Sequence, residues 1–351
     1  MGRLGVVLFN LGGPDRPEAI EPFLFNLFND SAIIGLPGIL RWPVAKFISS
    51  RRAPVARDIY RHLGGKSPLL EETRAQAEAL GRTLSVLLNE EADDVRVFIA
   101  MRYWHPMTAA TVSEVKAYDP NQIVLLPLYP QFSTTSTGSS IKEWRRETAA
   151  QGLVAPTRAV CCYPVEEGYI KSLAGSITPA IEEAQKQGRY RVLFSAHGLP
   201  EKNVAKGDPY PWQIEATAEA LVGALAVPDL DWAVCYQSRV GRLKWIGPSL
   251  DDEIERAGAD GVAVVVVPVA FVSEHSETLV ELDIEYREMA EKMGIPAYIR
   301  VPAIGVEETF ISALARIATQ ALKEGALKGD NETCSAQGGR QCPPEHRQCP
   351  L

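Results

Sequence analysis

The feature that most constrains this chain is the alternation of short, almost wholly apolar runs with longer amphipathic stretches. Continuous apolar runs rich in Val, Ile and Leu are typical of strands buried on both faces of a parallel sheet, and the amphipathic stretches are typical of helices that cover such a sheet. The pattern therefore predicts an α/β fold. The expected strands are 6–11, 95–101, 123–128, 158–162, 190–195, 232–236, 262–269 and 297–301. Helical periodicity predicts helices over 71–88, 170–187, 211–225, 277–292 and 307–323.

These strands are too many for one open sheet of average size, so we expect two parallel sheets of about four strands each, both flanked by helices. A weak internal repeat supports this division, because the strand exit 7–14 resembles 192–200 and the segment 124–128 resembles 265–269. We expect an N-terminal domain over 1–150 and a second domain over 151–304. We also expect a C-terminal helix over 305–325 that packs back across the domains, and a cysteine-containing tail over 326–351.

An apolar insertion at about 21–65 interrupts the first half of the chain. Pro and Gly occur in it too often for a long core helix, and it is too apolar for a solvated loop. It could be additional core, a lip that touches a membrane, or the wall of a site for a flat hydrophobic ligand. Several cations follow within it, which is typical of a solvated helix face or of a surface that meets anionic groups; they are Lys46, Arg51, Arg52, Arg57 and Arg61.

The charge balance excludes some partners. With 36 Lys plus Arg against 44 Asp plus Glu, the net charge is −8, so no strong basic field is available to neutralise phosphates and nucleic acid is not an expected partner. The first apolar run is too short to span a bilayer and lacks a signal-peptide cleavage region, which predicts a cytoplasmic protein. In that compartment the 6 cysteines are expected to be thiols or metal ligands rather than disulfides.

Candidate chemistry lies at the carboxyl ends of the predicted strands, where open α/β sheets bind ligands. His197 follows one strand and precedes a glycine that lets a ligand approach the backbone. After another strand come His275 and then Glu277, Glu281 and Glu285, which an α-helix would place one per turn along one face. Such a row suggests a relay for cations or protons. The simpler interpretations are a histidine satisfied by neighbouring carbonyls and a solvated acidic face.

Two further strand exits carry polar groups. Arg102 and Tyr103 place a guanidinium beside aromatic rings, and a hydroxyl-rich run around Ser136 leads into a helix N-terminus that could cradle an anion. The lysine and spacing of a P-loop are absent, as is the glycine fingerprint for dinucleotides, so a nucleotide site is not predicted.

Taken together, these segments resemble the ferrochelatase family. The resemblance is in the segments 195–200 (SAHGLP), 269–279 (VAFVSEHSETL), 129–131 (YPQ), 136–140 (STGSS), 237–241 (QSRVG) and 245–248 (WIGP). It extends from 10–14 (NLGGP) through 64–68 (GGKSP) to about residue 320. The resemblance implies two Rossmann-like domains of the class II chelatase type. It also implies the last step of protohaem synthesis, in which Fe2+ enters protoporphyrin IX in a cleft between the domains.

The resemblance also implies roles for individual residues. His197 and Glu277 match the pair that faces the pyrrole nitrogens and meets the metal, and His275, Glu281 and Glu285 match an acidic path for protons or metal. The matching porphyrin-pocket residues are Leu11, Arg102, Tyr103, Ser136 and Trp245, with the apolar insertion as the pocket lip. Some members carry Met or Tyr at the position of Leu11, beneath the macrocycle, so no axial metal ligand is expected from this side.

The chemistry of the residues agrees with this interpretation. A porphyrin must lose two N–H protons as it gains a dication, and a pocket that bends the ring exposes its nitrogen lone pairs, at a cost of about 1 to 5 kcal/mol of binding energy. A neutral imidazole can accept a proton near pH 7, and carboxylates can carry protons away or bind Fe2+ loosely.

The tail places Cys334, Cys342 and Cys349 close to the end of the sequence. Free thiols in a loose end are one interpretation, and a zinc site that includes His346 is another. Some ferrochelatases carry a C-terminal extension whose three cysteines bind a [2Fe-2S] cluster. By this resemblance Cys161 or Cys162 supplies the fourth thiolate, rather than the strand residue Cys235.

Other functions stay open at this level. A chelatase of the same architecture could act on coproporphyrin III or insert another divalent metal into a different tetrapyrrole. From other classes, a solute-binding protein or a nucleotide-sugar transferase could also have two such halves. The expected partners are a porphyrin and ferrous iron, with possible peripheral membrane contact through the apolar lip; the oligomeric state is not predicted.

Overall fold

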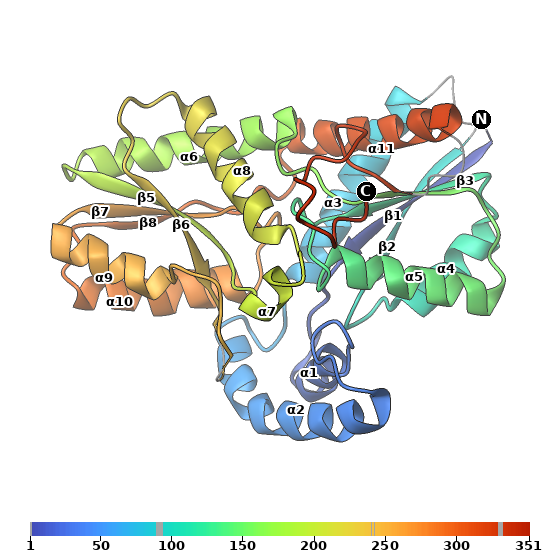
Figure 1. Ribbon diagram of the computed structural model, residues 1–351, viewed down its shortest axis with the longest axis horizontal. Coiled ribbons are helices and arrows are strands. Elements are labelled where there is room, and N and C mark those ends of the chain that lie inside the picture. Colours follow the sequence, from blue (N-terminus) through green and yellow to red (C-terminus); the bar gives the residue numbers. More distant parts are fainter. Residues whose placement is uncertain (1, 89–93, 240, 242, 329–332) are drawn as a thin grey trace. The chain divides into compact units, whose positions relative to one another are not determined.

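The fold contains two parallel β-sheets, each in its own compact unit (Figure 1). This computed structural model describes residues 2–88, 94–239, 241, 243–328 and 333–351. Unit 1 comprises Met1–Cys162, Leu314–Gly339 and Leu351, and unit 2 comprises Tyr163–Ala313 and Arg340–Pro350. The expected α/β class with two helix-flanked parallel sheets is confirmed, whereas the domain boundaries stay a prediction. Part of the expected tail, residues 329–332, lies outside the described residues.

The sheet of unit 1 has the strand order β2-β1-β3-β4-β9, with every neighbouring pair parallel. Its strands are β1 (Arg3–Asn10), β2 (Asp94–Met101), β3 (Gln122–Pro127), β4 (Thr157–Val160) and β9 (Thr333–Cys334). The first four were expected within a few residues, and β9 was not. Strand β1 is buried from Leu4 to Asn10 because helices cover both faces of a parallel sheet.

Helices α4 and α5 cover one face of this sheet. Val112 and Val115 of α4 and Ile141 and Trp144 of α5 pack with the strand residues around Phe9 in one buried cluster. A left-handed residue ends α5 at Gly152, with φ of 65°, where a residue with a Cβ would be strained. Among the described residues, the helices that lie wholly in unit 1 outside the apolar insertion are α3 (Leu69–Leu87), α4 (Thr108–Tyr118) and α5 (Thr137–Gln151).

The apolar insertion is helical and only partly buried. It forms the short 3-10 turn η1 (Pro17–Ala19), α1 (Ile20–Phe28) and α2 (Gly38–Arg61). Ile20, Phe23 and Leu24 of α1 are buried in a cluster with Tyr103 and Trp104, so this part is additional core. In α2, by contrast, Ile39 is 90% exposed, and other large apolar side chains are more than half exposed; they are Leu40, Trp42, Phe47 and Val55.

The sheet of unit 2 has the order β6-β5-β7-β8, again wholly parallel. Its strands are β5 (Tyr190–His197), β6 (Trp232–Gln237), β7 (Ala263–Pro268) and β8 (Tyr298–Arg300), and all four were expected. Every residue of β7 is buried, as its run of valines predicts. Helix α6 (Glu167–Gln185) precedes the first strand of unit 2, and the other α-helices lie between its strands. They are α7 (Glu201–Val204), α8 (Tyr210–Leu225), α9 (Leu250–Asp260) and α10 (Arg287–Lys292). The last long helix, α11 (Glu308–Lys328), contributes residues to both units.

One expected helix differs in kind. The segment 277–292 is helical, but Glu277–Tyr286 form a π-helix, η2, before the chain continues as α10. A π-helix bonds residues i and i+5, so its turn is wider than the α-helical turn that the periodicity assumed. Wide turns of this kind are frequent at functional sites.

Within each sheet, the strand order makes neighbours of two strands whose carboxyl ends lead into candidate site residues. In unit 2 the neighbours β6 and β7 lie on opposite sides of β5, so the chain changes direction between β5 and β7. In unit 1 the same change falls between β1 and β3. Open α/β sheets bind ligands at such switch points, beyond the carboxyl ends of the strands. His197 ends β5, and the segment that follows β7 carries His275 and Glu277.

Candidate active site

His197 closes strand β5 with one ring nitrogen engaged and the other free for chemistry. Its Nδ1 lies 2.6 Å from the carbonyl oxygen of Gly198. A carbonyl can only accept, so Nδ1 carries the hydrogen in the neutral ring and the lone pair resides on Nε2. The side chain is 41% exposed. The simpler interpretation of His197, satisfied by a neighbouring carbonyl, is therefore true of only one nitrogen.

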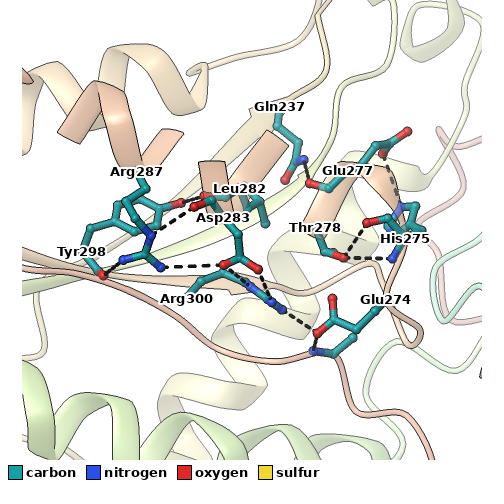
Figure 2. Close-up of polar contacts among 11 residues, drawn as sticks. Gln237, Glu274, His275, Glu277, Thr278, Leu282, Asp283, Arg287, Tyr298 and Arg300 are labelled. Atoms are coloured by element: carbon teal, nitrogen blue, oxygen red, sulfur yellow. Dashed lines mark hydrogen bonds and ion pairs between the residues drawn. The ribbon is translucent and has the colours of Figure 1, made fainter. Parts of the chain in front are cut away.

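The carboxylate of Glu277 lies between two imidazoles. Its Oε1 is 3.7 Å from Nε2 of His197, and its Oε2 is 3.7 Å from Nε2 of His275. Figure 2 shows Glu277 beside His275, at the start of η2. Unit 2 thus brings together three of the side chains that the sequence singled out from two separate strand exits.

Mutual attraction shifts the pKa values of this pair in opposite directions. Loss of hydration disfavours the charged imidazolium, but the negative charges of Glu277 and Glu281 and the carbonyl of Gly198 outweigh it, and the pKa of His197 rises above its usual range. Burial pushes the pKa of Glu277 up, yet His197, His275 and Ser238 outweigh that effect, and this pKa falls well below its usual range. Glu277 is consequently ionised at neutral pH.

Two polar atoms beside this pair are buried without a hydrogen-bond partner among the described residues. They are Nδ1 of His275 and Oε2 of Glu277. The ring of His275 packs against that of Phe271, with centroids 4.6 Å apart. Orphaned buried polar groups are costly in a purely structural cluster and are typical of a site that meets a ligand.

Glu281 is held by three donors from the end of β6. The backbone N–H of Ser238 donates to Oε1 at 2.7 Å, while the Ser238 hydroxyl and the Gln237 amide, the latter at 3.1 Å, donate to Oε2. Burial and the nearby charge of Glu277 raise the pKa of Glu281 despite these donors. The carboxylates of Glu277 and Glu281 therefore differ, since Glu277 is driven toward the ionised form and Glu281 toward the protonated form.

Glu285, the third acid of the expected row, is exposed at the far end of η2. Trp245 lies beside His197, with ring centroids 6.5 Å apart. It also closes around Gly198, where an added Cβ would lie 3.2 Å from the indole and 3.1 Å from the carbonyl oxygen of Gln237. Gly198 is thus required for a close approach of two backbone segments.

In unit 1, Arg102 and Tyr103 share a buried carboxylate. Asp30 accepts hydrogen bonds at Oδ2 from Nη2 of Arg102 at 2.8 Å, from the Tyr103 hydroxyl at 2.9 Å and from the hydroxyl of Ser139. Nε of Arg102 donates to Ser139 at 2.8 Å, and the guanidinium lies over the Tyr103 ring. Burial raises the pKa of Asp30, but the charge of Arg102 and these donors outweigh that effect. The pKa is lowered overall, so Asp30 is ionised.

The other two expected residues of unit 1 lie at neighbouring strand exits. Leu11 follows β1 and packs against the cluster around Phe23, while its carbonyl accepts a hydrogen bond from the backbone N–H of Tyr103. Ser136 is the residue before α5, and its hydroxyl and backbone N–H both point to the carbonyl oxygen of Ser133. Ser136 therefore uses its donors within its own turn.

The cysteines fall into two groups. In unit 1, Cys334 of β9 pairs in register with Val160, the backbone N–H of Cys161 donates to its carbonyl, and the sulfurs of Cys161 and Cys162 are 3.4 Å apart. In unit 2, Sγ of Cys342 accepts a hydrogen bond from the buried amide of Gln213. All 6 are buried free thiols. Within the residues that the structure describes, no group of three or more His, Cys, Asp or Glu side chains is arranged to hold a metal ion.

A family model decides which proteins this site belongs with. The ferrochelatase model matches residues 3–322, which includes every side chain described above except the cysteines of the tail. The chain belongs to the ferrochelatase family. Ferrochelatases that resemble it over nearly their whole length are known from Phenylobacterium zucineum (strain HLK1), 53% identical over 96% of this chain and 97% of the relative, and from Caulobacter vibrioides (strain NA1000 / CB15N), 51% identical over 99% and 97%.

Solved structures support the architecture of this family member. The sirohydrochlorin chelatase SirB from Bacillus subtilis subspecies spizizenii, in complex with cobalt, aligns with a TM-score of 0.54 over 93% of this chain and 98% of that chain, at 12% identity. SirB from Bacillus subtilis with Fe3+ aligns with a TM-score of 0.53 over the same shares, at 11% identity. At such identities the likeness concerns the fold alone.

Some residues of the site were missed at the sequence level. Gln237 and Ser238, which hold Glu281, carry amide and hydroxyl groups that give no local signal of their role. Asp30 offered one signal, since it is the only charged residue in the apolar stretch 22–40. A buried carboxylate needs partners, and here they are Arg102, Tyr103 and Ser139.

Proposed function

We propose that this enzyme inserts Fe2+ into protoporphyrin IX, releasing two protons and giving protohaem, the last step of haem synthesis. The observation that carries the proposal is the Glu277 carboxylate, 3.7 Å from Nε2 of both His197 and His275 in a chain of the ferrochelatase family. Such an arrangement offers a nitrogen base and an anionic oxygen ligand at one point, which is what the exchange of two protons for a dication requires.

In this mechanism His197 accepts protons from the pyrrole nitrogens through Nε2, because Nδ1 is already bonded to the Gly198 carbonyl. Glu277 stabilises the imidazolium that forms and offers its oxygens to the incoming Fe2+. Glu281, whose pKa is raised, is suited to receive a proton that leaves this pair. Glu285 continues the route to solvent, since it is exposed at the end of the same helix. His275 lies near Glu277 as well, with its Nε2 3.7 Å from Oε2 of the carboxylate, and adds to the field that keeps Glu277 ionised.

The porphyrin contacts in this proposal are made by a small set of side chains at strand exits. Arg102, fixed by Asp30 and Ser139, supplies a cation, and Leu11 supplies apolar surface. Tyr103 is fully buried, and its ring packs against the Arg102 guanidinium and supports it from within the unit. Trp245 supplies a flat ring beside His197, and Ser136 supplies a short polar side chain. Leu11 has no donor atom, so the metal receives no axial ligand from that residue.

One assay tests the substrate. Anaerobic protein is incubated with Fe2+ and, in separate reactions, with protoporphyrin IX, coproporphyrin III and sirohydrochlorin, and the spectrum of each metalloporphyrin is followed. We expect insertion into protoporphyrin IX to be the fastest. Faster insertion into coproporphyrin III would show that coproporphyrin III is the substrate instead. Insertion of Co2+ in preference to Fe2+ would show a chelatase for another metal. Porphyrin binding without any consumption of Fe2+ would contradict an enzymatic function.

We further propose a [2Fe-2S] cluster held by Cys334, Cys342, Cys349 and one of Cys161 and Cys162. The donor chemistry fits, because four Cys thiolates hold such a cluster, and β9 brings Cys334 beside the strand that leads into the free thiols of Cys161 and Cys162. Burial raises the pKa of the Cys235 thiol strongly, which makes Cys235 a poor thiolate ligand. The cluster would supply one-electron chemistry, and the protein contributes the thiolates and their burial.

For this cluster we expect protein purified without oxygen to be coloured and to contain acid-labile sulfide. Cys334→Ser should lose the visible absorption and the sulfide, whereas the matched variant Cys235→Ala should keep both. Separate Cys161→Ser and Cys162→Ser variants identify the fourth ligand by the same readout. Colourless wild-type protein without sulfide rules out the cluster.

We also propose that the enzyme is cytoplasmic and touches the membrane peripherally through α2. No helix in the described part of the chain has the length and apolar character needed to cross a bilayer. Helix α2 nevertheless exposes Ile39 and Phe47, and the guanidinium of Arg51 lies over the Phe47 ring. Exposed apolar side chains beside cations are the combination that binds anionic membrane surfaces.

If α2 binds membranes, wild-type protein should sediment with vesicles that contain phosphatidylglycerol and less with vesicles of phosphatidylcholine alone. Ile39→Glu should reduce the bound fraction severalfold. It adds a negative charge that the anionic vesicle repels, and it removes apolar area that the membrane would bury. Val154→Glu is the matched control, since Val154 is equally exposed and lies outside α2. Equal sedimentation of the two variants would contradict the proposed contact.

A further inference from the structure

The three acidic and imidazole groups of the proposed mechanism lie on one short segment whose ends are tied together. His275, Glu277 and Glu281 all fall between Glu274, which lies in the loop between β7 and η2, and Asp283, which lies in η2. Among the described residues, neither Glu274 nor Asp283 forms a hydrogen bond or an ion pair with His197. Both instead bind the same side chain, Arg300, the last residue of β8.

The guanidinium of Arg300 bridges the two carboxylates with separate nitrogens. Nη1 donates to Oε1 of Glu274 at 2.6 Å, while Nε donates to Oδ1 of Asp283 at 2.9 Å and Nη2 donates to Oδ2 of the same residue. Figure 2 shows Arg300 between the two acids. The planar fork of an arginine matches a carboxylate with two nitrogens and leaves a third for another acceptor, a geometry that a lysine ammonium does not reproduce.

This bridge is buried and reinforced by the backbone. The Arg300 side chain is 9% exposed, and Oε1 of Glu274 also accepts from the backbone N–H of Ala303 at 3.0 Å. Between the two tied ends, the Thr278 hydroxyl accepts from the backbone N–H of His275 and donates to the carbonyl of the same residue, both at 3.0 Å. The backbone of His275 is thus fixed both by Thr278 and by the adjacent Glu274.

The side-chain contacts of the site restrain Glu277 and His275 less than they restrain Glu281, which Gln237 and Ser238 hold. The Gln237 amide also donates to the backbone carbonyl of Glu277 at 3.1 Å, so it restrains the backbone there and not the carboxylate. Glu277 contacts the two imidazoles only at 3.7 Å, which is longer than a hydrogen bond, and Oε2 of Glu277 and Nδ1 of His275 have no hydrogen-bond partner in the described part of the chain. A π-helical turn is moreover held by i, i+5 bonds that the ordinary α-helical register would replace. The position of Glu277 opposite His197 therefore depends on the backbone that carries it.

We propose that Arg300 is a positioning residue for metal insertion: by tying Glu274 to Asp283, it sets the backbone segment that presents His275, Glu277 and Glu281 to His197. This inference rests on the proposed function of that cluster. Arg300 does not touch the substrate in this proposal and acts only through the two carboxylates.

The test compares Arg300→Lys with a matched control in the same unit. Arg191 is also a buried arginine that binds two carboxylates, those of Asp231 and Asp260, and its side chain is 6% exposed. It lies near the start of β5, whereas His197 is at the other end of that strand. Arg191→Lys thus loses an equivalent bridge without altering the segment 274–283.

We expect Arg300→Lys to lower kcat/KM for Fe2+ by about 10²-fold, the loss that a displacement of about 1 Å produces, while the Kd for the porphyrin, measured by fluorescence, stays within about twofold. Glu274→Gln, which keeps the size of the side chain but loses its charge, should give a smaller loss of the same kind. Arg191→Lys should lower the unfolding temperature comparably and leave kcat/KM within about twofold. A loss in Arg300→Lys no greater than in Arg191→Lys, or full activity of Arg300→Lys, would overturn the proposal.

A second readout does not need activity. Hydrogen exchange followed by mass spectrometry should show faster amide exchange in 274–283 for Arg300→Lys, and unchanged exchange there for Arg191→Lys. If wild-type protein inserts no metal into any porphyrin, the proposed function fails, and the exchange experiment still decides whether Arg300 fixes the segment. Unchanged exchange over 274–283 in Arg300→Lys excludes the positioning role whatever the activity.

Discussion

Replacement of His197 by alanine is expected to reduce iron insertion below detection while the protein still binds porphyrin. The variant removes the Nε2 lone pair that faces Glu277, and positioned general bases typically contribute about 10²- to 10⁴-fold to a rate. Binding should persist because Arg102, Tyr103 and Trp245, on which porphyrin contact depends in this proposal, are unchanged. The measurements are the anaerobic rate of metalloporphyrin formation and the Kd from porphyrin fluorescence.

The control for this variant is His62→Ala, which removes an exposed histidine that follows helix α2. It should keep the wild-type rate. Turnover of His197→Ala within about tenfold of wild type would remove His197 from the mechanism. A loss of porphyrin binding together with turnover would assign His197 to binding instead.

Glu277→Gln is the second substitution with a large expected effect, and it tests the electrostatic coupling of the site. The amide cannot offer a negative oxygen to Fe2+ or stabilise the imidazolium, so we expect kcat/KM to fall by about 10²- to 10⁴-fold. The pH dependence should change as well. The pKa of His197 is raised chiefly by the charge of Glu277, working against the loss of hydration, and removing that charge lowers this pKa.

The sign of the pH effect follows from the form of His197 that works. The neutral imidazole accepts protons, so activity is present above the pKa of His197 and is lost as the pH falls through it. Because Glu277→Gln lowers this pKa, the acidic limb of the kcat/KM profile should move to lower pH even though the maximum is smaller. Glu288→Gln, which removes an exposed acid of α10, should leave both the limb and the maximum unchanged. An acidic limb at the wild-type pH in Glu277→Gln would contradict the coupling.

Much of the fold could be predicted because buried strands and helices have characteristic local patterns of apolar residues. Runs such as Val264–Val267 are apolar at every position only when both faces of a strand are covered, and β7 lies where this rule expects it. Strand β9 has no such pattern. Thr333 and Cys334 extend the sheet because they pair with β4, which is a tertiary contact, and two residues carry no periodicity.

The site was predictable where it coincides with a strand exit. His197 and Glu277 could be singled out because ligands collect beyond the carboxyl ends of parallel strands. The expected row of Glu277, Glu281 and Glu285 assumed an α-helix, whereas these residues lie on a π-helix, in which Ser238 binds Glu281 and Glu285 is exposed. Their role as a path for protons or metal stays a prediction. Asp30 and Arg300 could not be assigned, because an ion pair between residues distant in the sequence produces no local pattern.

The pairing of β9 with β4 also orders events during synthesis. Ribosomes add roughly 5–20 residues per second, so the segment between Val160 and Thr333 takes on the order of ten seconds to emerge. During that interval all of unit 2 except its last residues is made, while β4 keeps an unpaired outer edge. The sheet whose first strand leaves the ribosome first thus waits for Thr333 and Cys334, and β4 must avoid strands of other nascent chains until its own partner arrives.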